Sequence, residues 1–244
     1  VNLMGTESEN WYSFLPTGTG KNWSEPENWS TGEVPNAADA QVRIGVTTAV
    51  KSGKGWRNVH LDQDATVGTL VFTCGGWTNR LDETGNLTLG GAGAAATVQV
   101  ADSSGAGLAM LDLDGTVTFA NNVTFDVANP AGDAGYGAFW AQGELDGNGK
   151  ALVKTGAGKM SFGFAGATNE QALGSIAVNE GTLAIYKRLT VTGVIAGAAG
   201  TTLELEINKD GGAADTAIRD VTCATLDVPS VRLFLKSNEN GTYV

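Results

Sequence analysis

Residues Ala151–Ile185 read ALVKTGAGKMSFGFAGATNEQALGSIAVNEGTLAI, and this stretch contains the clearest structural pattern of the chain. Apolar side chains alternate with polar or small ones at Met160, Phe162 and Phe164, which is the period of a β-strand with one buried face. Two further short strands, SIAV and TLAI, are separated by the turn signal Asn-Glu-Gly. The stretch therefore predicts successive short strands joined by tight corners.

Versions of one phrase recur along the chain, which indicates a repeated structural unit. They read VGTLVFT, TGNLTL, DGTVTF, EGTLAI and GTTLELEI. Gly or Asn between strands supplies the positive φ that each bend of a coil requires, and neighbouring turns of the coil bury each other's Leu and Phe side chains. The 35 glycines also disfavour helices. We predict an all-β fold, a right-handed parallel β-solenoid (β-helix). The alternative is a pair of antiparallel β-sandwich domains divided near residue 145.

The segment VKTGAGKMSF, followed by VNEGTL, resembles the autotransporter-associated β-strand repeat, whose members read roughly L-x-K-x-G-x-G-x-L-x-L…G…V-x-x-G-x-L. A second segment, NWSEPENWSTGEVPNAADAQVRI over 22–44, is similar to the opening segment of the same family. The resemblance implies a secreted protein of the bacterial cell surface, built as a parallel β-solenoid and displayed as a passenger-like stalk. Such proteins are seldom enzymes.

The sequence divides into a Trp-rich N-terminal part and a longer repetitive part. Residues 1–45 are interpreted as an N-terminal cap that covers the first turn of the solenoid, and residues 46–244 as the solenoid itself. Within the solenoid, 151–185 is the repeat motif. The segment 128–150, which contains Phe139 and Trp140, breaks the alternation and predicts an irregular loop.

The tryptophans have a second interpretation, because exposed aromatic rings stack on sugars. Under this alternative the protein is a carbohydrate-binding adhesin, and glycans are its partners. The candidate aromatic residues are Trp11, Trp23, Trp29 and Trp140, with Trp56 and Trp77 as further exposed candidates.

Charge and hydropathy exclude two classes of partner. With 26 Asp and Glu against 15 Lys and Arg the formal net charge is −11, which repels nucleic acids and anionic membranes. No apolar run reaches the roughly 18 residues that a membrane-spanning helix needs. Cys74 and Cys223 lie too many rungs apart to pair within a solenoid, since a disulfide needs Cα atoms within about 7 Å.

Acidic and histidine side chains give no catalytic constellation. His60 is the single histidine; with Asp62 and Asp64 nearby it is best interpreted as a strand-end residue, because a zinc site needs more ligands. Asp112 and Asp114 place two carboxylates on one strand face, which makes them weak calcium candidates. The carboxylate pairs at Asp62 and Asp64 and at Asp82 and Glu83 are not spaced as a recognisable glycosidase pair.

The Gly-rich segment TGAGKMS does not form a phosphate-binding loop. The pattern G-x-x-x-x-G-K-[ST] requires Gly at position 153 and Ser or Thr at position 160, where this chain has Val153 and Met160. No nucleophile elbow or Ser/His/Asp triad is present either. The sequence therefore predicts no enzyme activity and no cofactor.

These observations predict a non-enzymatic, extracellular structural protein, either a passenger-like stalk or a self-assembling fibre subunit. Self-association through the solenoid ends is expected, because the last predicted strand, SVRLFLK, has no Pro-rich or highly charged stop. The carbohydrate-binding adhesin is the alternative. A polysaccharide-cleaving β-helix enzyme is the least favoured function.

Overall fold

The computed structural model describes residues 11–15, 21–45, 56–73, 78–91, 93–101, 108–128, 138–166, 173–185, 189–208 and 221–236. Two long parallel sheets face each other, and a short 3-10 helix, η1 (Pro26–Asn28), precedes them. In spatial order the first sheet consists of β1 (Trp11–Ser13), β2 (Gln41–Ile44), β5 (Thr69–Thr73), β8 (Ala96–Ala101), β10 (Val123–Val127), β12 (Ala151–Thr155), β14 (Ser175–Val178), β17 (Val194–Gly197) and β20 (Thr225–Asp227).

The second sheet faces the first across the core. Its main path consists of β3 (Trp56–His60), β6 (Thr78–Glu83), β9 (Leu108–Phe119), β11 (Phe139–Asp146), β13 (Lys159–Gly166), β15 (Thr182–Ile185), β18 (Thr202–Asn208) and β21 (Val231–Lys236). The short strands β4 (Ala65–Val67) and β7 (Leu87–Leu89) extend it beside β9. A separate parallel pair is formed by β16 (Leu189–Thr190) and β19 (Val221–Thr222).

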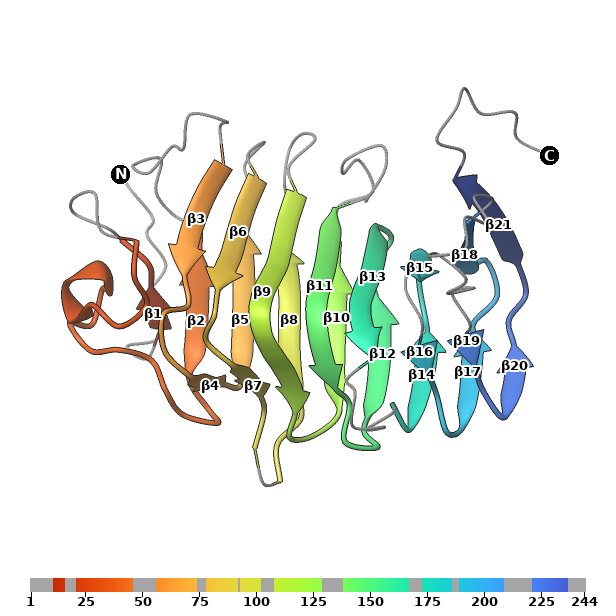
Figure 1. Cartoon of the computed structure of the whole chain (residues 1–244), viewed down its shortest axis with the longest axis horizontal. Helices are drawn as coiled ribbons and strands as arrows, with labels where there is room; N and C mark the ends of the chain where they lie inside the picture. The colour runs from red at the N-terminus through yellow and green to blue at the C-terminus, as the bar shows by residue number, and fades with distance from the viewer. Residues whose placement is uncertain are drawn as a thin grey trace, which may run out of the picture.

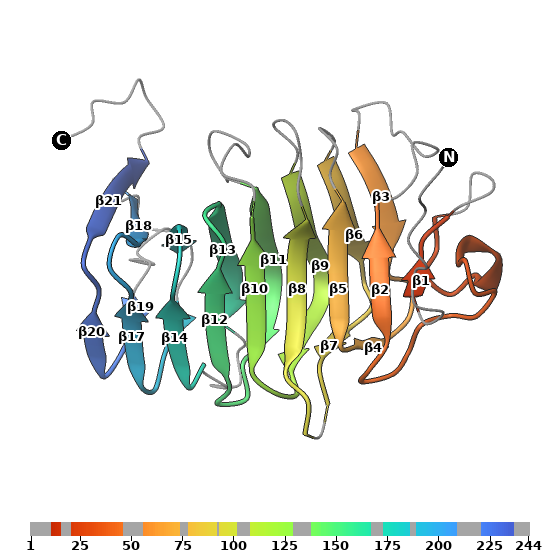
Figure 2. The ribbon, with the colours of Figure 1, turned by 180° about the vertical axis from the view of Figure 1, so that it is seen from behind.

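The chain alternates between the two sheets and advances by one strand at each turn, which confirms the predicted β-solenoid. Strands of the second sheet run downward in front, those of the first sheet run upward behind, and the turns advance from left to right, so the coil is right-handed (Figures 1 and 2). Every strand-to-strand ladder between the described strands is parallel. This pairing excludes the alternative of two antiparallel sandwiches.

Side chains at equivalent positions of successive turns form continuous apolar columns. In the first sheet one column runs through Val42, Leu70, Val98 and Phe125, all of them buried. The step between turns varies from the 19 residues between Ile176 and Ile195 to the 31 residues between Ile195 and Leu226. The columns keep their register because the corners, and not the strands, absorb this variation.

The aromatic residues of the core join the two sheets. Phe139 of β11 lies 5.5 Å from Phe125 and 6.2 Å from Phe72 between ring centroids. Both distances fall in the range of favourable aromatic pairs. The expectation of an irregular loop over 128–150 is therefore wrong for 139–146, which form a regular strand with Phe139 in the core; residues 129–137 lie outside the described part. An Ala138–Phe139 start hidden behind a Gly-rich stretch masks this strand in the sequence.

The Trp-rich segment caps the N-terminal end of the solenoid. Trp23 and Trp29 are buried and pack edge to face, with ring centroids 4.7 Å apart, and Trp29 makes a similar contact with Phe14. Their indole N–H groups donate to the carbonyl oxygens of Pro35 and Trp23, respectively. The large rings thus cover the first turn of the core without leaving a buried donor unpaired.

The same segment also pairs the edges of the first strands. Residues 28–30 hydrogen-bond the backbone of β1, and Lys21 and Trp23 exchange backbone hydrogen bonds with His60 at the end of β3. Because β1 and β2 belong to the first sheet, the cap proper is narrower than the predicted 1–45. An edge covered in this way does not offer free backbone groups to another strand.

The C-terminal end of the solenoid has the opposite character. Leu226 continues the column of Ile176 and Ile195 but is 48% exposed, and Leu233 stacks on Leu205 but is 56% exposed. Val231 is also exposed. The apolar columns therefore end openly at the last described turn.

Tight corners depend on glycine at positions where the backbone has positive φ. Gly156, between β12 and β13, has φ +77, and a Cβ there would press against the Val127 carbonyl oxygen of the preceding turn. Gly149 has φ +64 but has open space where a Cβ would stand. The two residues separate backbone strain from steric clash.

We expect Gly149→Ala to lower the free energy of unfolding by about 1–2 kcal/mol, the usual strain of a left-handed conformation. Gly156→Ala should cost about 3 kcal/mol or more, because overpacking adds to that strain. Urea unfolding followed by circular dichroism measures both changes. Equal losses in the two variants would contradict the proposed contact between successive turns.

Candidate functional site

The calcium candidates are not arranged to share an ion. Both lie on the outer face of β9, but Asp112 accepts a hydrogen bond from Arg80 Nε at 2.6 Å and contacts the same guanidinium through Nη2. Asp114, two residues on, is exposed. The strand placement expected from the D-x-D spacing is present, but a guanidinium already compensates the charge of Asp112.

Arg80 belongs to a polar network on the outside of the second sheet. Its Nη1 lies 2.9 Å from Asp82 Oδ2, which also accepts a hydrogen bond from Asn58 Nδ2 at 2.9 Å. His60 Nδ1 lies 2.6 Å from Asp82 Oδ1 and 3.2 Å from Glu83 Oε1. His60, Asp82 and Asp112 are register partners on three successive strands, so the network runs across the turns of the solenoid.

Asp82 is the most strongly constrained member of this network. Burial raises the pKa of Asp82, while the hydrogen bond from His60 and the charges of His60 and Arg80 act in the opposite direction. His60, Asp82 and Glu83 offer ligand atoms close enough to hold a metal, the one such group among the described residues. Arg80, however, places a permanent positive charge against the same carboxylate. We therefore interpret the cluster as a structural ladder.

His60 occupies the strand end that the sequence predicted, but its neighbours in sequence do not assist it. Asp62 caps the N-terminal segment, accepting hydrogen bonds from the backbone N–H and the hydroxyl of Ser24 at 3.0 and 2.5 Å. Asp64 accepts two hydrogen bonds from Asn86 of the next turn. Both aspartates thus hold adjacent turns together.

The lysine of the repeat motif points into the core. Lys154 stands in the column between Phe125 and Val178 and is fully buried. Its Nζ donates to the carbonyl oxygens of Thr155 and Gly156 at 2.7 Å and of Glu180 at 3.1 Å. Desolvation lowers the pKa of Lys154 to about 8, although Asp126 and Glu180 raise it. The ammonium group therefore fastens the corner carbonyls of two successive turns.

The aromatic candidates for glycan stacking have different environments. Trp23 and Trp29 are buried in the cap and present no ring face to a ligand. Trp11 is half-buried, with the Arg43 guanidinium 4.5 Å from its ring centroid. Trp140 is half-buried on β11. The side chain of Trp56 and the whole of Trp77 lie outside the described part of the chain.

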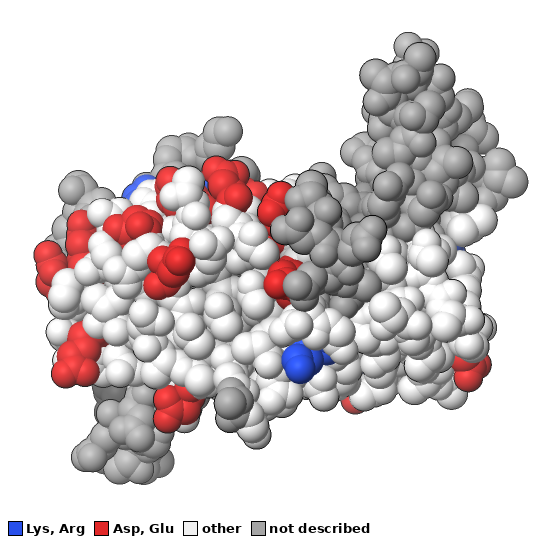
Figure 3. Space-filling view, turned by 60° about the horizontal axis from the view of Figure 1, so that its bottom comes forward, with Lys and Arg blue, Asp and Glu red and all other residues white. Residues whose placement is uncertain are grey.

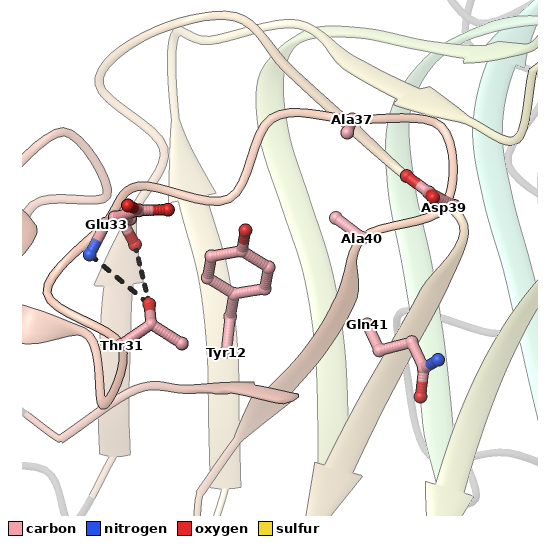
Figure 4. Close-up of a pocket in the computed structure, with 7 residues that line it drawn as sticks. All are labelled: Tyr12, Thr31, Glu33, Ala37, Asp39, Ala40 and Gln41. Carbon is pink, nitrogen blue, oxygen red and sulfur yellow. Dashed lines mark hydrogen bonds between the residues drawn. The ribbon is translucent and has the colours of Figure 1, made fainter. Parts of the chain in front are cut away.

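A hollow of about 510 Å³ lies between β1 and the loop that leads into β2 (Figure 4). Its lining consists of Tyr12, Thr31, Glu33, Ala37, Asp39, Ala40 and Gln41. Sequence analysis did not single out these residues. The alternation Ala-Asp-Ala-Gln before β2 would have placed Asp39 and Gln41 on one face, but nothing in the sequence brings Tyr12 opposite them.

Comparisons of the chain with protein-family models, with curated proteins and with solved structures gave no match. The likeness of 151–185 to the autotransporter-associated repeat therefore stays a prediction. No helix among the described residues is long and apolar enough to cross a membrane. The Cys223 thiol is free and half-buried, and Cys74 lies outside the described residues.

Lys154→Met should lower the free energy of unfolding at pH 7 by about 1–3 kcal/mol, because three corner carbonyls lose their donor. The difference should widen as the pH rises from about 8 to 10.5. In that window the unfolded lysine keeps its proton and the buried one loses it, so the wild-type protein gains stability that the variant cannot gain.

Chemical unfolding of both proteins across this pH range measures the effect. Lys150→Met, which removes a lysine of the same turn from a half-buried loop position, serves as the control. A constant difference between Lys154→Met and wild type from pH 7 to 10.5 would contradict a lowered pKa.

Proposed function

We propose that this chain is a non-enzymatic structural segment of an extracellular bacterial surface protein, in which stacked turns form a passenger-like stalk. The observation that carries the proposal is the contrast between the two ends of the solenoid. The N-terminal end is closed by Trp23 and Trp29, whereas Leu226, Val231 and Leu233 leave the C-terminal end apolar and open. A column that is closed at one end only suits a stalk that terminates in a cap.

The capped end favours the stalk over the self-assembling fibre. A head-to-tail fibre requires the C-terminal turn of one copy to stack on the first turn of the next, and such heterologous contacts propagate without limit. Residues 21–30 already pair the edges of β1 and β3 and bury the first turn. Two copies can therefore meet only through their C-terminal ends, and a two-fold contact of this kind closes on itself.

Two further observations support a structural task. The clustered polar groups of the second sheet are hydrogen-bonded to one another, as in the ladder of His60, Asp82 and Arg80. The likeness of 151–185 to a repeat of secreted surface proteins supports the extracellular location. The acidic surface is consistent with this proposal, since acidic side chains keep a displayed protein soluble.

We expect the purified chain to form discrete particles, with reversible two-fold dimers at high concentration and no fibres. Leu233→Lys should shift this equilibrium to the monomer by at least tenfold, because the charge would be buried in the dimer contact. Sedimentation velocity at two protein concentrations and negative-stain electron microscopy measure the outcome.

The matched control is Ala95→Lys, which adds the same charge at an exposed loop far from the open end. Circular dichroism verifies that both variants fold. Fibres with a regular axial repeat in the wild-type protein would overturn the capped stalk in favour of a fibre subunit. Dimers that survive Leu233→Lys in a folded protein would remove the C-terminal end as the contact.

A further inference from the structure

The hollow beside β1 is built around one aromatic ring. Tyr12 is half-buried: part of its ring packs on the core, and the rest forms the floor between two loop segments. In Figure 4, Glu33 and Asp39 lie on opposite sides of this ring, and Gln41 lies below Asp39. The volume of about 510 Å³ falls within the range of small-molecule sites.

The polar groups of this hollow are not used by the fold. Thr31 Oγ1 is engaged with the backbone of Glu33. In the described part of the chain, no hydrogen bond or ion pair holds the carboxylates of Glu33 and Asp39, the amide of Gln41 or the hydroxyl of Tyr12. This differs from the second sheet, where the aspartates at 62, 64, 82 and 112 hold adjacent turns together.

The charge of the hollow and its surroundings favours a cationic ligand. The lining contains two carboxylates and no lysine or arginine. Acidic side chains also prevail over the N-terminal half of the face in Figure 3, where few basic ones are visible. Such a surface concentrates cations and repels anions over distances of a Debye length, about 8–10 Å.

We propose that this hollow binds a glycan through a protonated amino sugar. A pyranose ring can stack its C–H face on Tyr12, as aromatic floors do in polar ligand sites. Its ammonium group then pairs with the carboxylate of Asp39 or Glu33, and its hydroxyls bond Gln41 and the other carboxylate. Because the carboxylates lie on opposite sides of the ring, they suit a ligand of sugar size better than a single metal ion.

The site lies at the capped end of the solenoid, opposite the open end. A recognition site at this position is the tip of the stalk proposed above, but the glycan proposal rests on the hollow alone. It also differs from the tryptophan platform predicted from the sequence, because Trp23 and Trp29 are buried in the cap. Either proposal can fail without the other.

The test is isothermal titration calorimetry of the whole chain with a β-1,4-linked glucosamine trimer, at a pH that keeps the amines protonated. The N-acetylated trimer, which has the same rings without the charge, is the matched ligand. We expect the glucosamine trimer to bind at least tenfold more tightly. Asp39→Asn and Glu33→Gln should each weaken its binding by about tenfold, the equivalent of one lost charge-assisted hydrogen bond.

Glu27→Gln is the control variant, because Glu27 is an exposed acid of the cap that does not line the hollow. It should change the affinity less than twofold. Equal loss in Glu27→Gln and Asp39→Asn would reduce the binding to non-specific charge attraction and overturn the site. Equal affinity for the two trimers, or for a lysine trimer, would overturn the specificity for an amino sugar.

Discussion

The register between successive turns is the constraint on which the rest of the structure depends. A turn of this solenoid buries one face of each strand only when the next turn places an apolar side chain directly over it. Val42, Leu70, Val98 and Phe125 satisfy this condition in one unbroken column although the turns differ in length. A slip of one residue would bring the polar faces inward, so register and stability are the same property here.

Lys154 is the one charged side chain in that column, and its position explains the repeat motif in physical terms. A buried ammonium group is tolerated because the corner supplies three carbonyl acceptors at hydrogen-bond distance. Gly156 provides one of them and also adopts the positive φ that brings the corner close to the previous turn. Lysine and glycine two residues apart therefore form one device that closes the corner.

The two ends of the column determine how the molecule can interact with others. At the N-terminal end the Trp-rich segment covers both the side chains and the strand edges, and it also forms the loop over the Tyr12 hollow. At the C-terminal end the column ends with exposed Leu226 and Leu233. Recognition and continuation of the stack are thus assigned to opposite ends, and the lateral faces are occupied by polar ladders such as that of Arg80, Asp82 and Asp112.

The sequence by itself determined the strands, their buried faces and the coil, because alternation and glycine corners are local properties that survive in any register. It also placed the cap and His60 correctly. Only the tertiary structure decided which residues meet across a turn of 19 to 31 residues. That non-local pairing turned Lys154 inward, made Phe139 a core residue and brought Tyr12 opposite Asp39. No local pattern encodes those contacts, because they depend on the path of the corners and on the stacking of whole turns.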